Sequence, residues 1–172
     1  MERKNFFEIF KRYCPAPDIY AVLSRAENVK LSRFDRDQMI VEVDLYYTSH
    51  EDPIFFYLAE EECRMLYEAQ VFRIIPHFTP DAFRIEYFSE ITTEASICGA
   101  CTKGFFANAT YADNGEEILC YLPFGSLGIE FVENGNTSQI LKNILFSRYG
   151  IHRNIRLLED IPAAALGAER RR

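Results

Sequence analysis

Two cysteines three positions apart, Cys98 and Cys101, are the residues whose spacing first suggests chemistry. In thiol–disulfide enzymes such a pair opens a helix after a strand, where the helix dipole lowers a thiol pKa. Here the pair follows an expected helix and has no expected strand before it. A structural zinc site would need two more ligands at matching spacing, and the other cysteines lie far away in the expected topology. We therefore predict reduced, metal-free thiols.

A second pair, Asp35 and Asp37, has the D-x-D spacing with which polymerases hold two metal ions. Such ligands stand at a rigid strand end, whereas these two lie at the tip of a short hairpin, so we interpret them as turn residues. The histidines, His50, His77 and His152, are scattered and suggest no Cys–His or Ser–His pair. Glycine-rich phosphate loops are absent from the sequence. The sequence thus predicts no complete catalytic site, no metal site and no cofactor.

The composition is that of an ordinary globular protein. Of the 172 residues, 48 % are hydrophobic and 15 % are aromatic, and the net charge is −7. The negative charge argues against general attraction to nucleic acid, because phosphate binding depends on clustered Lys and Arg. The odd number of cysteines, five, and the lack of an apolar run that resembles an export signal or a membrane span predict a cytoplasmic protein.

The first half of the chain is expected to fold as helix, strand, strand, helix, strand. The elements are a helix over 2–14, hairpin strands around 29–31 and 39–47, a helix over 53–67 and a strand over 70–78. Alternation of apolar and polar residues predicts the hairpin, and Asp52-Pro53 supplies a helix cap followed by proline in the first turn. The side chains that this helix is expected to bury are Ile54, Phe55, Leu58, Met65 and Leu66.

The second half repeats this plan with one more helix. The elements are a helix from Thr79-Pro80 to about residue 98, hairpin strands at 105–112 and 117–122, a short helix near 127–133, a helix over 137–149 and a strand over 151–158. Asn114-Gly115 is a strong hairpin signal, and Gly150 stands where a helix C-cap belongs. We predict an α+β fold of two small units, 1–78 and 79–160, with the start of a linker at 161–172.

Two groups of residues are candidate contacts with other molecules. A small basic face near the end of the second half could meet a phosphate backbone; it comprises Lys142, Arg153 and Arg156. Three aromatic residues near strand edges would suit a protein interface if they are exposed; they are Tyr46, Tyr47 and Phe56. The alternative for the aromatic residues is that all of them belong to the core.

The order strand, strand, helix, helix, strand after a leading helix resembles that of a type II KH fold. True KH modules clamp nucleotides with a G-x-x-G turn between the two helices. This chain has Glu133-Asn134-Gly135-Asn136 at that place, with one glycine and an acidic flank. Each half therefore resembles a pseudo type II KH unit that lacks the nucleotide clamp.

Over about residues 3–160 the chain is similar to the N-terminal regions I and II of the PolC-type DNA polymerase III alpha subunit of Gram-positive bacteria. Three segments carry the resemblance: LYYTSHEDPIFFYLAEEEC, FFANATYADNGEEILCYLPF and GIEFVENGNTSQILKNILFSRYGI. The resemblance implies that 1–78 and 79–160 correspond to regions I and II. It also implies a non-catalytic role in DNA replication by docking to a replisome protein such as the clamp-loader tau subunit.

The same resemblance implies that DNA polymerase and 3′–5′ exonuclease activities belong to other parts of the parent protein, because no catalytic residue of the family corresponds to a position of this chain. DNA would then be a partner only through those other parts. Two alternatives remain open at this point: a KH-like single-stranded nucleic-acid-binding module, and a small enzyme that uses the Cys98 and Cys101 thiols.

Overall fold

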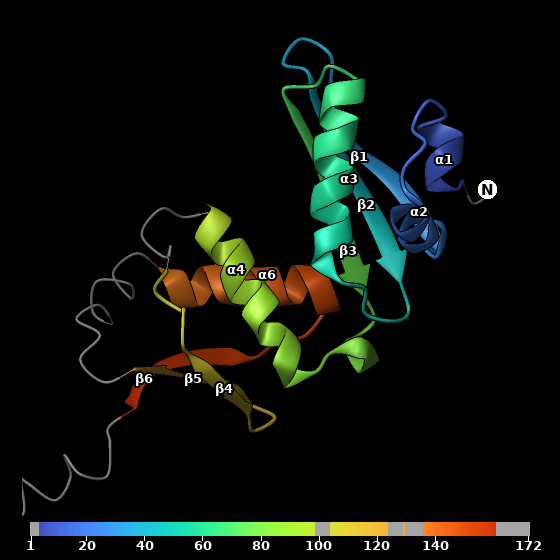
Figure 1. Ribbon diagram of the computed structural model, residues 1–172. Helices are drawn as coiled ribbons and strands as arrows, with labels where there is room; N and C mark the ends of the chain where they lie inside the picture. The colour runs from blue at the N-terminus through green and yellow to red at the C-terminus, as the bar shows by residue number, and fades with distance from the viewer. Residues whose placement is uncertain (1–3, 99–103, 124–128, 130–135, 161–172) are drawn as a thin grey trace, which may run out of the picture. The chain divides into compact units, whose positions relative to one another are not determined.

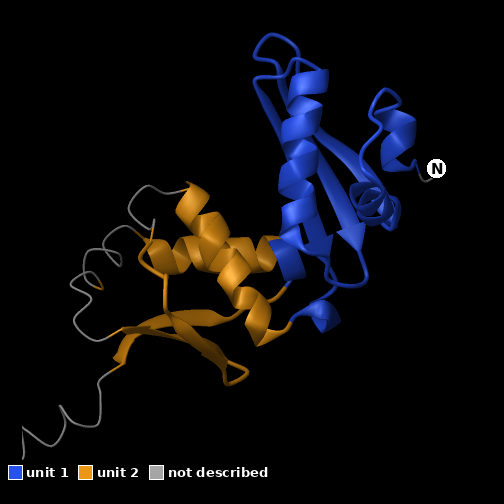
Figure 2. Ribbon diagram, viewed as in Figure 1, with its two compact units in different colours: residues 1–83, 148–150 blue, residues 84–147, 151–172 orange. Residues whose placement is uncertain are grey.

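The computed structural model describes residues 4–98, 104–123, 129 and 136–160 (Figure 1). They form two three-stranded mixed sheets with helices, which confirms the α+β fold. The chain divides into two compact units, coloured separately in Figure 2. Unit 1 consists of residues 1–83 and 148–150, and unit 2 of residues 84–147 and 151–172. Every helix in the described parts is too short or too polar to cross a membrane.

The sheet of unit 1 contains β1 (Asn28–Asp35), β2 (Ile40–Tyr47) and β3 (Val71–Phe78), in that order. β1 and β2 form the antiparallel hairpin that the alternation predicted, and β3 runs parallel to β2. A parallel neighbour requires a crossover connection, which α3 (Pro53–Leu66) supplies. Figure 1 shows α2 and α3 on the same face of this sheet. The strand residues on that face make the core of unit 1.

The N-terminal helix is much shorter than predicted. α1 contains only Phe6–Ile9, and a second helix, α2 (Pro17–Ser24), follows the prolines. The sequence pattern predicted no helix between residues 14 and 29. Pro17 occupies the first turn of α2, where its missing N–H needs no partner. The end of α2 is tied to the chain before α3 by a bidentate ion pair, in which Arg25 Nε and Nη2 donate to the buried Glu51 carboxylate at 2.6 and 2.7 Å.

Helix α3 begins as predicted but buries a different face. Asp52 Oδ1 accepts a hydrogen bond from the Ile54 N–H at 3.0 Å and caps the helix. The buried residues are Phe56, Ala59 and Cys63, whose spacing of three and four places them on one face.

The prediction of the buried face of α3 was therefore wrong: Phe55 and Leu66 are half-buried, and Ile54, Leu58 and Met65 are exposed. These three side chains are between 46 % and 67 % exposed. Two apolar stripes run along the helix. The stripe with the small side chains Ala59 and Cys63 lets the helix approach the sheet closely. Hydrophobicity alone favoured burial of the other stripe, whose side chains are larger.

Unit 2 has the same strand order. β4 (Thr110–Asp113), β5 (Glu117–Pro123) and β6 (Asn154–Asp160) lie side by side, with β4 antiparallel and β6 parallel to β5. α4 (Phe88–Cys98) and α6 (Thr137–Tyr149) contribute the helical side of its core. The Asn114-Gly115 turn is confirmed, with Gly115 at φ +93°, and Gly150 adopts φ +65° directly after α6.

Three expected elements of the second half differ from the structure. The helix expected from Thr79 begins only at Phe88, after the two 3-10 turns η1 (Pro80–Ala82) and η2 (Ile85–Tyr87). The Thr79 hydroxyl does not cap a helix and instead donates to the Thr48 carbonyl at 3.0 Å. The strand expected over 105–112 is confined to β4, and the last strand starts three residues late. The short helix near 127–133 lies outside the described residues except for Ile129.

Candidate protein-binding surface

Exposed apolar side chains are concentrated in unit 1. Among the described residues, ten of the twelve large apolar side chains that are exposed belong to unit 1, and only Ile97 and Phe146 belong to unit 2. The ten are Tyr20, Leu31, Phe34, Met39, Tyr46, Ile54, Tyr57, Leu58, Met65 and Val71. Single exposed apolar residues need no explanation, but a strong bias toward one unit points to contact surfaces there.

The strand β1 is an edge of the unit 1 sheet, and among the described strands it pairs with β2 alone. Of its eight residues only Val29 is buried. Leu31 and Phe34 lie opposite Val43 and Val41 of β2, on the face that the helices cover elsewhere, yet they are 42 % and 60 % exposed. The helices therefore leave this end of β1 uncovered.

The opposite edge, β3, is blocked in two ways. The Ile74 N–H donates to Glu60 Oε1 of α3 at 2.7 Å, so this edge amide already has an acceptor. Two residues further along the strand, Pro76 has no N–H to offer. An N–H taken by a side chain and a proline are both known protections of sheet edges. On β1, within the described parts of the chain, only the Val29 N–H is shown with a side-chain acceptor, Asn28 Oδ1 at 3.0 Å, near the start of the strand. The two edges of unit 1 thus differ, with β3 protected along its middle and β1 open toward the hairpin end.

The Glu60 contact can be tested by mutation. Glu60→Ala is expected to lower the free energy of unfolding by about 1–3 kcal/mol, because a largely buried N–H loses its acceptor. Urea unfolding followed by circular dichroism measures the change. The control is Glu61→Ala, which removes an exposed residue that pairs with Arg64 and should leave the unfolding midpoint unchanged. Equal midpoints for the two variants would contradict the assigned role of Glu60.

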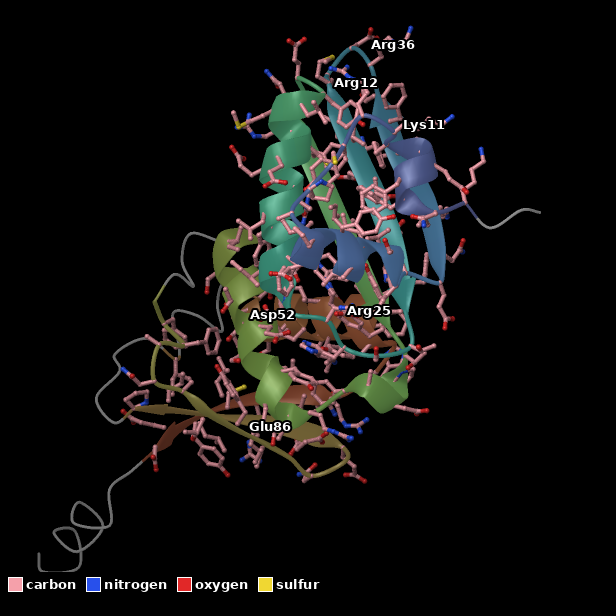
Figure 3. All side chains as sticks on the ribbon, turned by 45° about the vertical axis from the view of Figure 1, so that its right-hand side comes forward. Lys11, Arg12, Arg25, Arg36, Asp52 and Glu86 are labelled. Carbon is pink, nitrogen blue, oxygen red and sulfur yellow. The ribbon has the colours of Figure 1, made fainter. Side chains whose placement is uncertain are left out.

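Basic residues accompany the exposed apolar ones on β1. Lys30 and Arg33 lie opposite Asp44 and Glu42 of β2, on the face away from the helices. Arg36 stands at the tip of the β1–β2 hairpin, at the same end of unit 1 as Lys11 and Arg12 (Figure 3). The segment 30–36 holds three cations and one carboxylate, 3 − 1 = +2, in a chain of net charge −7. β1 therefore has an apolar face and a basic face.

On the face of the same sheet that points away from α2 and α3, Tyr46, His77 and Asp44 form a cluster. His77 Nε2 lies 2.8 Å from Asp44 Oδ1, and the Tyr46 ring stacks on the His77 ring with centroids 4.8 Å apart. The cluster links the neighbouring strands β2 and β3, where Tyr46 pairs with His77 and Asp44 with Ile75 in the parallel register. We interpret the cluster as a cross-strand contact that orders this face.

Of the three aromatic residues expected at a protein interface, only Tyr46 reaches the surface. Tyr47 is 4 % exposed and its hydroxyl donates to the Val22 carbonyl at 3.2 Å, while Phe56 is 2 % exposed and packs on the Tyr47 ring. For Tyr47 and Phe56 the alternative that they belong to the core is therefore the one that holds, because both side chains point into the space between the sheet and the helices. Phe34 and Leu31 are the exposed residues that the sequence argument missed.

The three basic residues of unit 2 lie in different surroundings. Lys142 of α6 donates to Asn154 Oδ1 at 3.3 Å, beside a cavity of about 480 Å³ with polar walls. Arg153 forms an ion pair with Asp113 at 3.2 Å. Arg156 is exposed on β6, opposite Leu119. Two of the three are thus engaged in local contacts.

The described residues considered for chemistry belong to different elements. Cys98 is a free, exposed thiol at the end of α4, and Cys101 lies outside the described residues. Asp35 Oδ1 accepts from the Gln38 N–H at 2.9 Å, which confirms its role in the turn. Within the described ranges, no three His, Cys, Asp or Glu side chains are grouped to hold a metal ion.

Two further cysteines are buried in the cores, Cys63 in unit 1 and Cys120 in unit 2. Burial raises the pKa of each of these thiols to about 12, and the Glu62 charge adds to the effect at Cys63. A thiol with such a pKa is protonated and unreactive at neutral pH. These two cysteines are therefore core residues and not candidate nucleophiles.

No protein-family model, curated protein or solved structure matches the chain.

Proposed function

We propose that this chain is a non-catalytic protein-docking module that acts in DNA replication by binding a replisome protein. The observation that carries the proposal is the concentration of exposed apolar side chains in unit 1, together with its open edge strand β1. Interfaces are built around such side chains, with aromatic residues as frequent anchors. Among the described residues, Cys98, Asp35, Cys63 and Cys120 belong to separate elements, which supports a binding role over catalysis.

The place of this module in replication rests on the similarity to regions I and II of PolC-type polymerases in the three segments quoted above. On that basis the partner is the clamp-loader tau subunit, and the compartment is the cytoplasm. DNA is a weaker partner in this proposal. A chain of net charge −7 repels phosphates at range, and its exposed Lys and Arg side chains would make only salt-sensitive contacts.

A direct comparison of partners tests the proposal. Binding of the chain to purified clamp-loader tau, to single-stranded DNA and to primed DNA is measured by fluorescence anisotropy. Each titration is made at about 150 mM salt, where surface charges are well screened. We expect saturable binding to tau and weak DNA binding that disappears as salt is raised. Submicromolar DNA binding without binding to tau would overturn the proposal and favour the KH-like nucleic-acid-binding module.

A further inference from the structure

The edge strand β1 has the features of a site for another strand. A strand at the edge of a sheet presents unpaired backbone N–H and C=O groups along its outer side, and an extended peptide can add to the sheet by pairing with them. Those of β1 pair with no other described strand. The edge at β3, by contrast, is blocked by Glu60 and Pro76.

The side chains of β1 define what an added strand must carry. On one face it would meet Leu31 and Phe34, and on the other Lys30 and Arg33. Successive side chains of a strand point to opposite faces. A matching strand therefore alternates apolar residues with acidic residues, because opposite charges across neighbouring strands are favourable and like charges are not.

A second copy of the same chain does not fit this description. Two β1 strands side by side would bring two basic segments together, each with a net charge of +2 over residues 30–36. The bulge between Leu31 and Arg33, where the Ser32 hydroxyl donates to the Glu42 carbonyl at 3.1 Å, also bends the edge. Bulges and edge lysines discourage the pairing of long flat edges, so a short partner segment of opposite charge is favoured.

We propose that β1 binds a short extended segment of a partner protein in which acidic and apolar residues alternate, and that this segment becomes a fourth strand of the unit 1 sheet. The inference deepens the proposed docking function and rests on it for the biological partner. It can nevertheless be tested with synthetic peptides, independently of which protein supplies the segment.

The test uses the full chain and fluorescein-labelled octapeptides. The first peptide alternates Glu and Val, the second has the same composition as four Glu followed by four Val, and the third alternates Lys and Val. We expect saturable binding of the alternating Glu/Val peptide, at least tenfold weaker binding of the block peptide and no saturable binding of the Lys/Val peptide. Equal binding of the alternating and block peptides would overturn the inference, because charge alone would then explain both.

Variants locate the site. Lys30→Glu with Arg33→Glu is expected to weaken binding of the Glu/Val peptide at least tenfold, and Phe34→Ala several-fold. The matched control, Arg64→Glu with Arg73→Glu, makes the same change in net charge on α3 and β3 and should leave binding unchanged. Phe34 is exposed, so its replacement keeps the test valid if the charge-reversed chain fails to fold. Equal effects of the two double variants would exclude β1 as the site.

The remaining outcomes separate this inference from the docking function. If the Lys30→Glu, Arg33→Glu chain still binds tau and the parent chain binds no Glu/Val peptide, the inference fails and the docking function stands. If the peptide binds at β1 but tau does not bind, the edge site stands and the replisome partner is wrong. The last outcome is that the parent chain binds oligo(dT) but no peptide, and that the Lys30→Glu, Arg33→Glu chain loses oligo(dT) binding. This outcome would assign the basic face of β1 to nucleic acid and overturn the inference.

Discussion

Phe56→Ala is expected to lower the free energy of unfolding by about 3–5 kcal/mol, the usual cost of truncating a buried phenylalanine. The side chain is almost fully buried, and its ring lies 5.7 Å from that of Tyr47, between α3 and the sheet. Small domains are stable by only about 5–15 kcal/mol, so this one change removes a large share of the stability. Urea unfolding followed by circular dichroism measures the effect.

The matched control is Phe34→Ala, which truncates the same residue type on the exposed part of β1. A surface substitution of this kind changes stability by less than about 0.5 kcal/mol. The pair of variants separates the core from the docking surface, because Phe56→Ala should reduce stability whereas Phe34→Ala should reduce only partner binding. Similar losses of stability in the two variants would show that the end of β1 is packed more closely than its exposure indicates.

Stability is expected to fall steeply as pH rises from about 9 to about 12. The buried thiols of Cys63 and Cys120 have a pKa raised to about 12 by burial, whereas in the unfolded chain they ionise near their ordinary value of 9.0. Ionisation then favours the unfolded chain, so the stabilisation is complete below pH 9 and is lost as pH rises toward 12. At pH 11 the loss is about 2–3 kcal/mol for each thiol. Urea midpoints at a series of pH values measure the loss.

Two buried tyrosines extend the same dependence to higher pH. Burial raises the pKa of Tyr47 and of Tyr13, and the hydrogen bond to Glu62 acts in the same direction at Tyr13. Cys63→Ala with Cys120→Ala should flatten the profile between pH 9 and 10 and leave the tyrosine part above it. Cys14→Ala, at an exposed cysteine, is the control and should leave the profile unchanged. An unaltered profile in the buried double variant would refute the assignment to thiols.

The sequence determined those features that depend on neighbouring residues. Alternation along 40–47 and the Asn114-Gly115 turn were sufficient for the two hairpins, because strand faces and tight turns are set by local backbone preferences. Asp52-Pro53 was sufficient for the start of α3 for the same reason. The class of fold, two small α+β units, followed from the order of these elements.

Pro76 in a strand was a local signal that the sequence argument did not use. A proline inside a strand indicates an edge, because it has no N–H to donate to a neighbouring strand. It identifies β3 as one edge of the unit 1 sheet. The role of Glu60 is different, since only the packing of α3 beside β3 brings its carboxylate to the Ile74 N–H.

Only the tertiary structure decided which apolar side chains are buried. α3 carries two apolar stripes, and the choice between them depends on how closely Ala59 and Cys63 let the helix approach the sheet. Phe56 and Phe34 are the same residue type in opposite environments. α3 covers β2 and β3, whereas the end of β1 that holds Phe34 is exposed. Burial is a property of the whole packed unit, so no local pattern could distinguish the core from the surface proposed for binding.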